Sequence, residues 1–189
     1  MHKTDPHFTG DGVLPHDFAL TYDQLEASVL VLGPGRRRWD AAWRHKLVRL
    51  SKLLVGQLWA VGIEEVYLDG SFVESKPRPN DIDGYFVCSA DRFFEAQLPR
   101  LQQLDRCWTW DEDQLRFAAD TAKPQLPMWH KYRTELYPHY AELSASGLKG
   151  PTGEDLTFPD AFRRRREDFH PKGLIRIIPD AGPTKRRAR

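Results

Sequence analysis

The chain has 189 residues, a hydrophobic fraction of 40% and a formal net charge of +1. This length fits one domain with a substantial hydrophobic core. Its two cysteines are too few for a metal cage and are expected to be buried free thiols. The sequence contains no signal peptide, long apolar run or lipidation motif, so it predicts a cytoplasmic protein that does not engage a membrane.

Positive charge is concentrated towards the C-terminal end. Residues 160–189 contain ten Lys or Arg and four acidic residues, so the rest of the chain is net negative. Four arginines, Arg163–Arg166, are consecutive, and on a helix they would spread around all sides. A solvated helix end with local pairing to Glu167 and Asp168 is therefore favoured, and a contact surface for nucleic acid or triphosphate is the alternative. The segment Lys185–Arg189 is expected to be a disordered basic tail that could contact RNA.

Three elements are predicted before the central motif. Residues 1–20 show no periodicity and are expected to form an irregular lead-in. Thr21 and Gln24 have the spacing of a capping box and predict a helix that continues to Leu32. A long helix ending at Gly62 is predicted by apolar residues that recur in steps of three and four: Trp43, Leu47, Leu50, Leu54, Leu58 and Val61.

The most informative stretch is residues 66–87. A short apolar strand ends at Gly70-Ser71, and about ten residues later Asp81 and Asp83 flank Ile82 at the start of a second strand. Alternation along a strand points both aspartates to one face and Ile82 into the core. Adjacent carboxylates repel unless a cation lies between them, and Mg²⁺ is commonly held by one or two carboxylates plus substrate phosphates. A glycine turn leading into a helix offers backbone amides to those phosphates.

The second half of the chain predicts further elements in order. They are a helix over residues 89–104 with a kink at Pro99, a polar helix over 111–123, a strand over 129–137, a short helix over 140–148 and a short strand over 174–178. Together the elements predict an α/β (α+β) fold with a small mixed sheet packed against helices. A single domain is expected over residues 21–178, followed by a basic tail at 179–189.

The order of strand, Gly-Ser, connector and Asp-x-Asp resembles the signature of the DNA polymerase β-like nucleotidyltransferase superfamily. Further segments resemble a family of small, functionally uncharacterised bacterial and phage nucleotidyltransferase-like proteins: Gly12–Pro15, Asp69–Val73, Lys76–Pro77, Pro79–Asp83 and Pro171–Ile175. The resemblance implies a nucleotidyltransferase-like fold. It also implies that Gly70 and Ser71 bind phosphate and that Asp81 and Asp83 are catalytic metal ligands. One departure from the superfamily pattern is Gly84, which stands where an apolar residue is usual and could loosen the strand.

A basic phosphate contact is also expected near the motif. Lys76, Arg78 and Lys172 could each serve, and Lys76 is favoured because it lies inside the connector between the two strands. The alternative is that each of these side chains is solvated and has no role in binding.

The superfamily has a third acidic ligand on a later strand, and we assign it to Glu135. This residue lies on the only later segment that is predicted to be a strand before the basic region. Glu135 would complete the metal site and help to deprotonate the attacking hydroxyl. The alternative is a surface ion pair with Arg133 and Lys131, which would share its face of the strand.

The predicted function is therefore metal-dependent nucleotidyl transfer. With Mg²⁺, or alternatively Mn²⁺, the enzyme would move a nucleoside monophosphate from an NTP to a hydroxyl of RNA or protein, with ATP the expected nucleotide. Two alternatives stay open. One is a non-catalytic nucleotide- or RNA-binding module of the same fold, and the other is a toxin–antitoxin or phage-defence component that acts through a protein partner.

Overall fold

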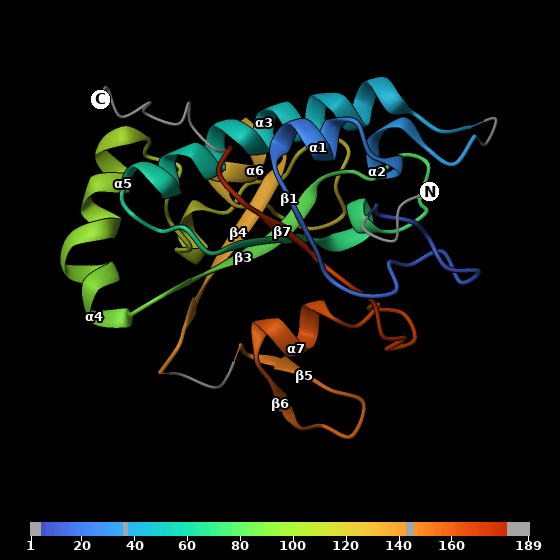
Figure 1. Cartoon of the computed structure of the whole chain (residues 1–189). Helices are drawn as coiled ribbons and strands as arrows, with labels where there is room; N and C mark the ends of the chain where they lie inside the picture. The colour runs from blue at the N-terminus through green and yellow to red at the C-terminus, as the bar shows by residue number, and fades with distance from the viewer. Residues whose placement is uncertain (1–4, 36–37, 143–145, 181–189) are drawn as a thin grey trace, which may run out of the picture.

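The computed structural model describes residues 5–35, 38–142 and 146–180 (Figure 1). Its centre is a five-stranded mixed sheet in the order β1-β7-β2-β3-β4. The strands are β1 (Phe18–Leu20), β2 (Val66–Asp69), β3 (Ile82–Cys88), β4 (Thr134–Tyr140) and β7 (Ile175–Ile177). The predicted α+β architecture with a small mixed sheet is thus confirmed. The predicted basic tail at 185–189 lies outside the described residues.

The last strand in the sequence occupies an inner position in the sheet. β7 pairs in parallel with β1 and antiparallel with β2. The expectation of an irregular lead-in over residues 1–20 is therefore wrong at Phe18–Leu20, which form the edge strand β1. Three residues are too short a stretch for periodicity to reveal, and this strand exists because β7 offers it a partner.

Helices cover one face of the sheet: α1 (Tyr22–Glu26), α2 (Val29–Leu32), α3 (Ala41–Ala60) and α6 (Pro127–Tyr132) (Figure 1). The long predicted helix is α3, where the Asp40 side chain accepts a hydrogen bond from the Trp43 amide and caps the first turn. Leu47, Leu54 and Leu58 on its inner face are fully buried. This helix supports the sheet from behind.

The predicted single helix from Thr21 to Leu32 is instead two short helices. Thr21 and Gln24 do form the capping box of α1. Ser28 then accepts a hydrogen bond from the Leu30 amide and caps α2. A serine that bonds to nearby backbone amides competes with helix continuation, so the chain breaks there.

The helical stretch predicted over residues 89–104 is present, with an irregular centre. It consists of α4 (Ala90–Arg92), a π-helical turn η2 (Phe93–Gln97) and α5 (Leu98–Leu104). Pro99 has no N–H to donate to a carbonyl in the preceding turn, and a widened turn accommodates this loss. The two cysteines, Cys88 and Cys107, are free and buried as expected.

The segment between α5 and β4 differs most from the sequence-based prediction. The polar helix expected over residues 111–123 is a single turn, η3 (Glu112–Gln114), followed by an extended bridge between Arg116 and Gln125. The strand expected from residue 129 begins only at Thr134. Pro127 starts α6 in its place, because proline is well suited to the first turn of a helix, and Arg133 ends this helix with a left-handed φ of 50°.

The short helix expected over residues 140–148 is also wrong for the described part of that range. Tyr140 is still paired with Cys88 at the end of β4, and Leu148–Lys149 form strand β5. The sequence pattern predicts a strand only as far as residue 137. Pairing with the long strand β3 extends β4 to Tyr140.

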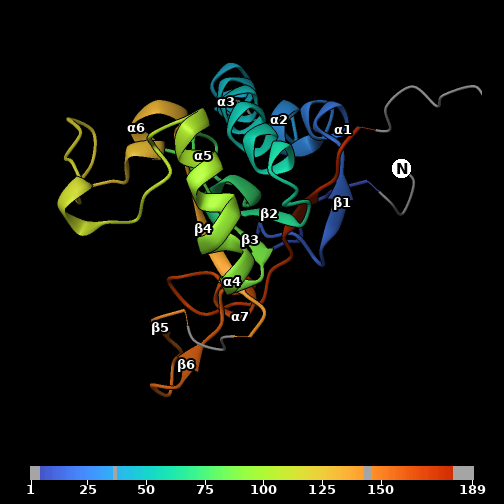
Figure 2. The same cartoon turned by 90° about the vertical axis from the view of Figure 1, so that its left-hand side faces the viewer.

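We call residues 146–170 the cap, because this segment covers the sheet face opposite the helices (Figures 1 and 2). The cap contains the hairpin β5 (Leu148–Lys149) and β6 (Asp155–Leu156) and the short helix α7 (Phe158–Phe162). Phe158 stacks on Tyr137 with ring centroids 5.4 Å apart, and Phe162 stacks on Tyr85 at 5.8 Å. The sheet is therefore enclosed between helices and cap. No helix in the described ranges is long and apolar enough to cross a membrane.

Candidate functional site

Three acidic side chains form a row across adjacent strands. Asp69 at the end of β2 pairs with Asp83 of β3, and Asp83 pairs in turn with Glu135 of β4. Directly paired residues on neighbouring strands point to the same face of a sheet. Asp69, Asp83 and Glu135 accordingly line one cavity of about 470 Å³ between the sheet and the cap. Asp69 and Glu135 are only 3% and 4% exposed.

The crowding of carboxylates changes their proton affinity. Burial and the nearby charges of Asp81, Asp69 and Glu135 raise the pKa of Asp83 to about 8, and Lys123 opposes the shift. Burial also raises the pKa of Asp69 to about 7, against the effect of its ion pair with a lysine. Neighbouring negative charges make it unfavourable for these carboxyl groups to ionise, and the same charges stabilise a bound cation.

Asp81 lies one residue before β3, beside this row. Its Oδ2 accepts a hydrogen bond from Nε1 of Trp129 at 2.7 Å, and Trp129 is buried in α6. Ile82 is fully buried, so the chain alternates here as the sequence predicts. Asp81 is half-buried and does not line the cavity, although its charge contributes to the raised pKa of Asp83.

Glu135 is held by two hydrogen bonds. Its Oε1 accepts from the Leu126 amide at 3.0 Å, and its Oε2 accepts from the Tyr137 hydroxyl at 2.9 Å. The sequence predicts Glu135 beside the aspartates, on a strand that starts at residue 129. In the structure, β4 still brings Glu135 opposite Asp83.

The alternative reading of Glu135 as part of a surface ion pair is wrong. Lys131 pairs with Asp105 at 2.6 Å, and Arg133 pairs with Asp120 at 2.8 Å. Because Lys131 belongs to α6 and Arg133 ends that helix, neither lies on the strand that carries Glu135.

The Gly-Ser turn approaches the carboxylate row very closely. Gly70 has a φ of 73°, which favours glycine, and begins the 3₁₀ turn η1 (Gly70–Val73). A Cβ atom at Gly70 would collide with the Asp83 carboxylate. Ser71 follows and lines the same cavity. Gly84 does not loosen its strand, because a side chain there would strike the Tyr67 carbonyl and the glycine permits close strand pairing.

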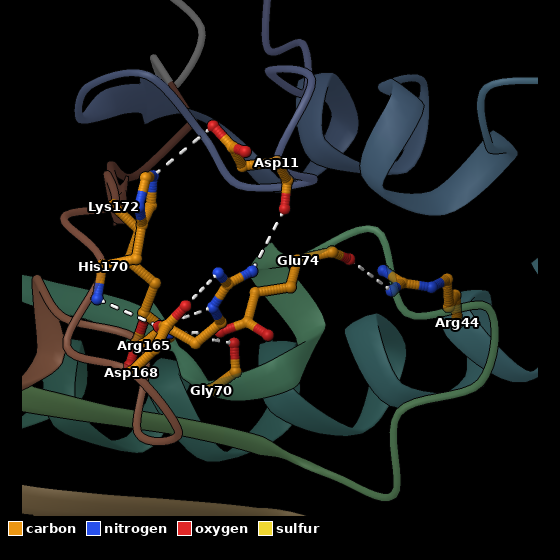
Figure 3. A network of polar contacts seen from close by, with 9 residues as sticks. Asp11, Arg44, Gly70, Glu74, Arg165, Asp168, His170 and Lys172 are labelled. Atoms are coloured by element: carbon orange, nitrogen blue, oxygen red, sulfur yellow. Dashed lines mark hydrogen bonds and ion pairs between the residues drawn. The ribbon is translucent and has the colours of Figure 1, made fainter.

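A buried arginine fixes the turn and the connector to α3. Arg44 is fully buried and donates hydrogen bonds to the carbonyls of Phe72 (2.8 Å), Glu74 (3.1 Å), Lys76 (2.6 Å) and Leu30 (2.5 Å). Figure 3 shows its guanidinium directed at the Glu74 backbone. These four bonds leave the Gly-Ser turn little freedom to move.

Lys76 is not at the site, whereas Lys172 is. Lys76 is exposed and does not line the cavity. Lys172 is 7% exposed, and its ammonium lies 3.0 Å from Asp69 Oδ1. The same ammonium lies 2.8 Å from Glu74 Oε1 and 3.5 Å from the Gly70 carbonyl (Figure 3). It neutralises one end of the carboxylate row. The sequence offers both lysines and favours Lys76, because only the fold brings residue 172 to the turn.

Segments far apart in the sequence meet around this turn. The Ser75 amide donates to the Gly12 carbonyl at 2.7 Å, and the Gly173 amide donates to the Leu14 carbonyl at 2.9 Å. The N-terminal segment, the motif and the segment before β7 therefore form one structural unit at the site.

The four consecutive arginines have different surroundings, and they are not on a helix, since α7 ends at Phe162. Arg163 pairs with Asp17 at 2.6 Å. Arg165 pairs with Asp168 at 2.5 Å and donates to the Asp11 carbonyl (Figure 3). Arg164 and Arg166 are exposed and line the cavity. The expected helix end is thus wrong, because the run follows α7 in turns, whereas the expected local pairing is present between Arg165 and Asp168.

The predicted metal ligands, Asp81, Asp83 and Glu135, are all carboxylates, the donor type that Mg²⁺ and Mn²⁺ accept. Within the described ranges, however, no three or more His, Cys, Asp or Glu side chains are grouped so that they could hold a metal ion. Asp81 and Glu135 are instead bonded to neighbouring protein groups. The residues fit an ion that arrives with phosphates better than one held in a preformed cage.

Comparison with known proteins identifies a family. The model of a family of unknown function, DUF6932, matches residues 6–178, and because this match spans most of the chain, the chain belongs to that family. No curated protein and no solved structure matches the chain. The function therefore has to be argued from the site itself.

Proposed function

We propose that this member of the DUF6932 family is a metal-dependent nucleotidyltransferase. It transfers a nucleoside monophosphate from an NTP, with ATP the expected nucleotide, to a hydroxyl of RNA or protein and releases pyrophosphate. One observation carries the proposal. The Gly70-Ser71 turn and the row of Asp69, Asp83 and Glu135 meet in one cavity. Phosphate-binding backbone and acidic side chains are the two parts that phosphoryl chemistry needs side by side.

Asp83 and Glu135 in the cavity, with Asp81 beside them, would hold Mg²⁺ or Mn²⁺. When bound, the ion neutralises phosphate charge and activates a hydroxyl for attack. Since Mg²⁺ is usually bound by one or two carboxylates together with substrate phosphates, the proposal does not require a preformed three-residue cage.

The chain's own residues supply positioning and proton transfer. Gly70 lets phosphates approach the backbone without a side chain in the way, and Arg44 keeps this turn in place. Glu135 is oriented by the Leu126 amide and the Tyr137 hydroxyl and is available to accept the proton of the attacking hydroxyl.

A second candidate is a nucleotide-binding module without transfer activity. The observation that favours it is the engagement of Asp81 and Glu135 by protein donors, together with the lack of a three-residue metal group in the described ranges. Such a module would bind ATP in the same cavity and release it unchanged.

Labelling separates the two candidates. The protein is incubated with each NTP labelled at the α-phosphate, with Mg²⁺ or Mn²⁺, and with whole-cell RNA or protein. We expect label on one class of macromolecule, and its loss in Asp81→Asn/Asp83→Asn. The matched control is Asp111→Asn/Asp113→Asn, an exposed Asp-x-Asp pair away from the cavity, which should label normally.

Transfer that persists in folded Asp81→Asn/Asp83→Asn contradicts the proposal. ATP binding with no labelling by any NTP supports the non-catalytic module in its place.

A further inference from the structure

The cavity has walls of opposite charge. The sheet contributes the carboxylate row, with Lys172 paired to Asp69 at one end and Lys123 also lining the cavity. The cap contributes Lys149 and Arg164–Arg166 against a single acid, Glu167. We propose that Arg164 and Arg166 bind the phosphates of a nucleoside triphosphate, in the role that the sequence suggested for Lys76. This assignment rests on the proposed function for the class of ligand, and it names residues and a surface that the motif does not contain.

These two guanidinium groups are available to a ligand. Arg163 and Arg165 are paired with Asp17 and Asp168. In contrast, the side chains of Arg164 and Arg166 form no hydrogen bond or ion pair with any described residue.

The backbone positions of the two arginines are nevertheless defined. The Arg164 amide donates to the Ala161 carbonyl at 3.2 Å, and Arg164 bridges to Pro171. Arg166 lies near enough to Tyr137 for its charge to oppose the burial that raises the pKa of this tyrosine.

Charge complementarity indicates the chemistry of the ligand. A molecule that spans the cavity must present negative groups to the two guanidinium groups, which bind phosphate oxygens in bidentate geometry. The same molecule must tolerate the acidic row opposite, which a polyphosphate does when it brings a divalent cation. A neutral ligand would leave both charged walls without a partner.

The remaining lining suits a nucleoside. A volume of about 470 Å³ falls in the usual range for small-molecule sites, about 300–1,000 Å³. Apolar side chains from the cap complete the surface: Leu148, Leu156, Phe158, Phe162 and Phe169. Phe169 has a φ of 57°, rare for a bulky residue, and its amide donates to the Arg165 carbonyl at 2.8 Å. A turn held in this way presents an aromatic ring to the cavity where a base could stack.

Binding of ATP tests the assignment. Isothermal titration calorimetry with ATP and Mg²⁺ compares the wild type with Arg164→Gln/Arg166→Gln. Loss of a charged hydrogen-bond donor should weaken ATP binding by about tenfold for each arginine. The matched control is Arg49→Gln/Arg106→Gln, which removes the same charge from exposed positions outside the cavity and should change affinity by less than about threefold.

A ligand series identifies what the arginines contact. The difference between wild type and Arg164→Gln/Arg166→Gln should shrink from ATP to ADP to AMP, as phosphates are removed. Inorganic tripolyphosphate should bind more weakly than ATP, because it cannot use the apolar lining. Circular dichroism should show the fold intact, since neither side chain supports it.

Several results would overturn the assignment. They are wild-type protein that does not bind ATP, a double variant that binds ATP as tightly as the wild type or as the control, and a deficit equal for ATP and AMP. Tripolyphosphate binding as tightly as ATP would overturn the nucleoside part.

The assignment and the transfer reaction fail separately. Arginine-dependent ATP binding without any labelling removes the transferase proposal and keeps the phosphate-binding arginines. Labelling that continues in Arg164→Gln/Arg166→Gln with an unchanged KM for ATP removes the arginines and keeps the transferase.

Discussion

The Gly-Ser turn and the cap face each other across one cavity, but different forces hold them. The turn is tied by hydrogen bonds and ion pairs from buried groups, Arg44 on one side and Lys172 on the other. The cap rests on the sheet through aromatic stacking of Phe158 and Phe162, and its ion pair between Arg163 and Asp17 is partly exposed to solvent. Directional bonds to buried carbonyls fix geometry tightly, whereas stacked rings tolerate small shifts. The side of the cavity with the motif is therefore rigid, and the side with the free arginines is adaptable.

The largest loss of stability is expected from substitution of Arg44, because the motif side of the cavity depends on this residue. Arg44→Met leaves buried carbonyls of the turn and connector without donors, so we expect the free energy of unfolding to fall by about 4 kcal/mol or more. Urea denaturation measures it. Arg49→Met on the exposed face of the same helix is the control and should change stability by no more than about 0.5 kcal/mol. Equal losses in both variants would refute the role given to Arg44.

A smaller loss is expected from Lys172→Met. The variant leaves Asp69 and Glu74 without their cation, and removing one partner of a buried ion pair costs about 3 kcal/mol. Thermal or urea unfolding measures this loss, and a second change, Asp69→Asn, should recover part of it. Lys76→Met is the control and should leave both stability and ATP binding unchanged. An ATP-binding defect in Lys76→Met would return the phosphate contact to the residue that the sequence suggested.

Substituting one glycine in the turn and one in the cap compares the two regions directly. Gly70 and Gly153 both have positive φ, 73° and 89°, but a Cβ atom at Gly70 collides with Asp83 and one at Gly153 meets open space. Gly153→Ala should cost only the backbone strain, about 1 kcal/mol, and Gly70→Ala should cost about 2–3 kcal/mol. Gly70→Ala should also abolish nucleotide labelling. Normal labelling in Gly70→Ala would show that phosphates do not need the open backbone at this turn.

The smallest change in stability is expected in the cap. Phe162→Leu removes the ring that stacks on Tyr85 and should cost about 1 kcal/mol. Since the cap carries Arg164 and Arg166 and Phe162 itself lines the cavity, the same variant should weaken ATP binding measurably while the fold persists. Phe117→Leu, at a residue that is 72% exposed, is the control for both measurements. Unchanged ATP affinity in Phe162→Leu would show that aromatic stacking does not set the position of the arginines.

Sequence alone located the motif, because Gly70, Asp81 and Asp83 lie close together in the chain and their spacing is informative. It did not find Arg44, although the signal was present. Arg44 lies three and four residues before Leu47 and Val48, within the buried stripe of α3, and an arginine in such a stripe must have buried acceptors. A pattern of apolar residues gives no information about a charged residue within it.

Other parts of the site could not be predicted from local patterns. Asp69 gains its place from pairing between β2 and β3, and Lys172 gains its place from the inner position of β7. Both are long-range consequences of the sheet order. The start of strand β4 was predicted too early, because the two-face alternation over residues 129–137 resembles a strand, while Pro127 and the left-handed Arg133 define a helix over its first part.

The inner position of β7 has a consequence for how the protein is made. During synthesis, β1 and β2 emerge long before their shared neighbour, Ile175–Ile177, and each waits with an unsatisfied edge. Closure of the sheet depends on contacts across more than a hundred residues, which slows folding. Lys172 arrives with the same segment. A nascent chain released before residue 172 would therefore display the whole Gly-Ser and Asp-x-Asp motif with neither a completed sheet nor the ammonium group that balances Asp69.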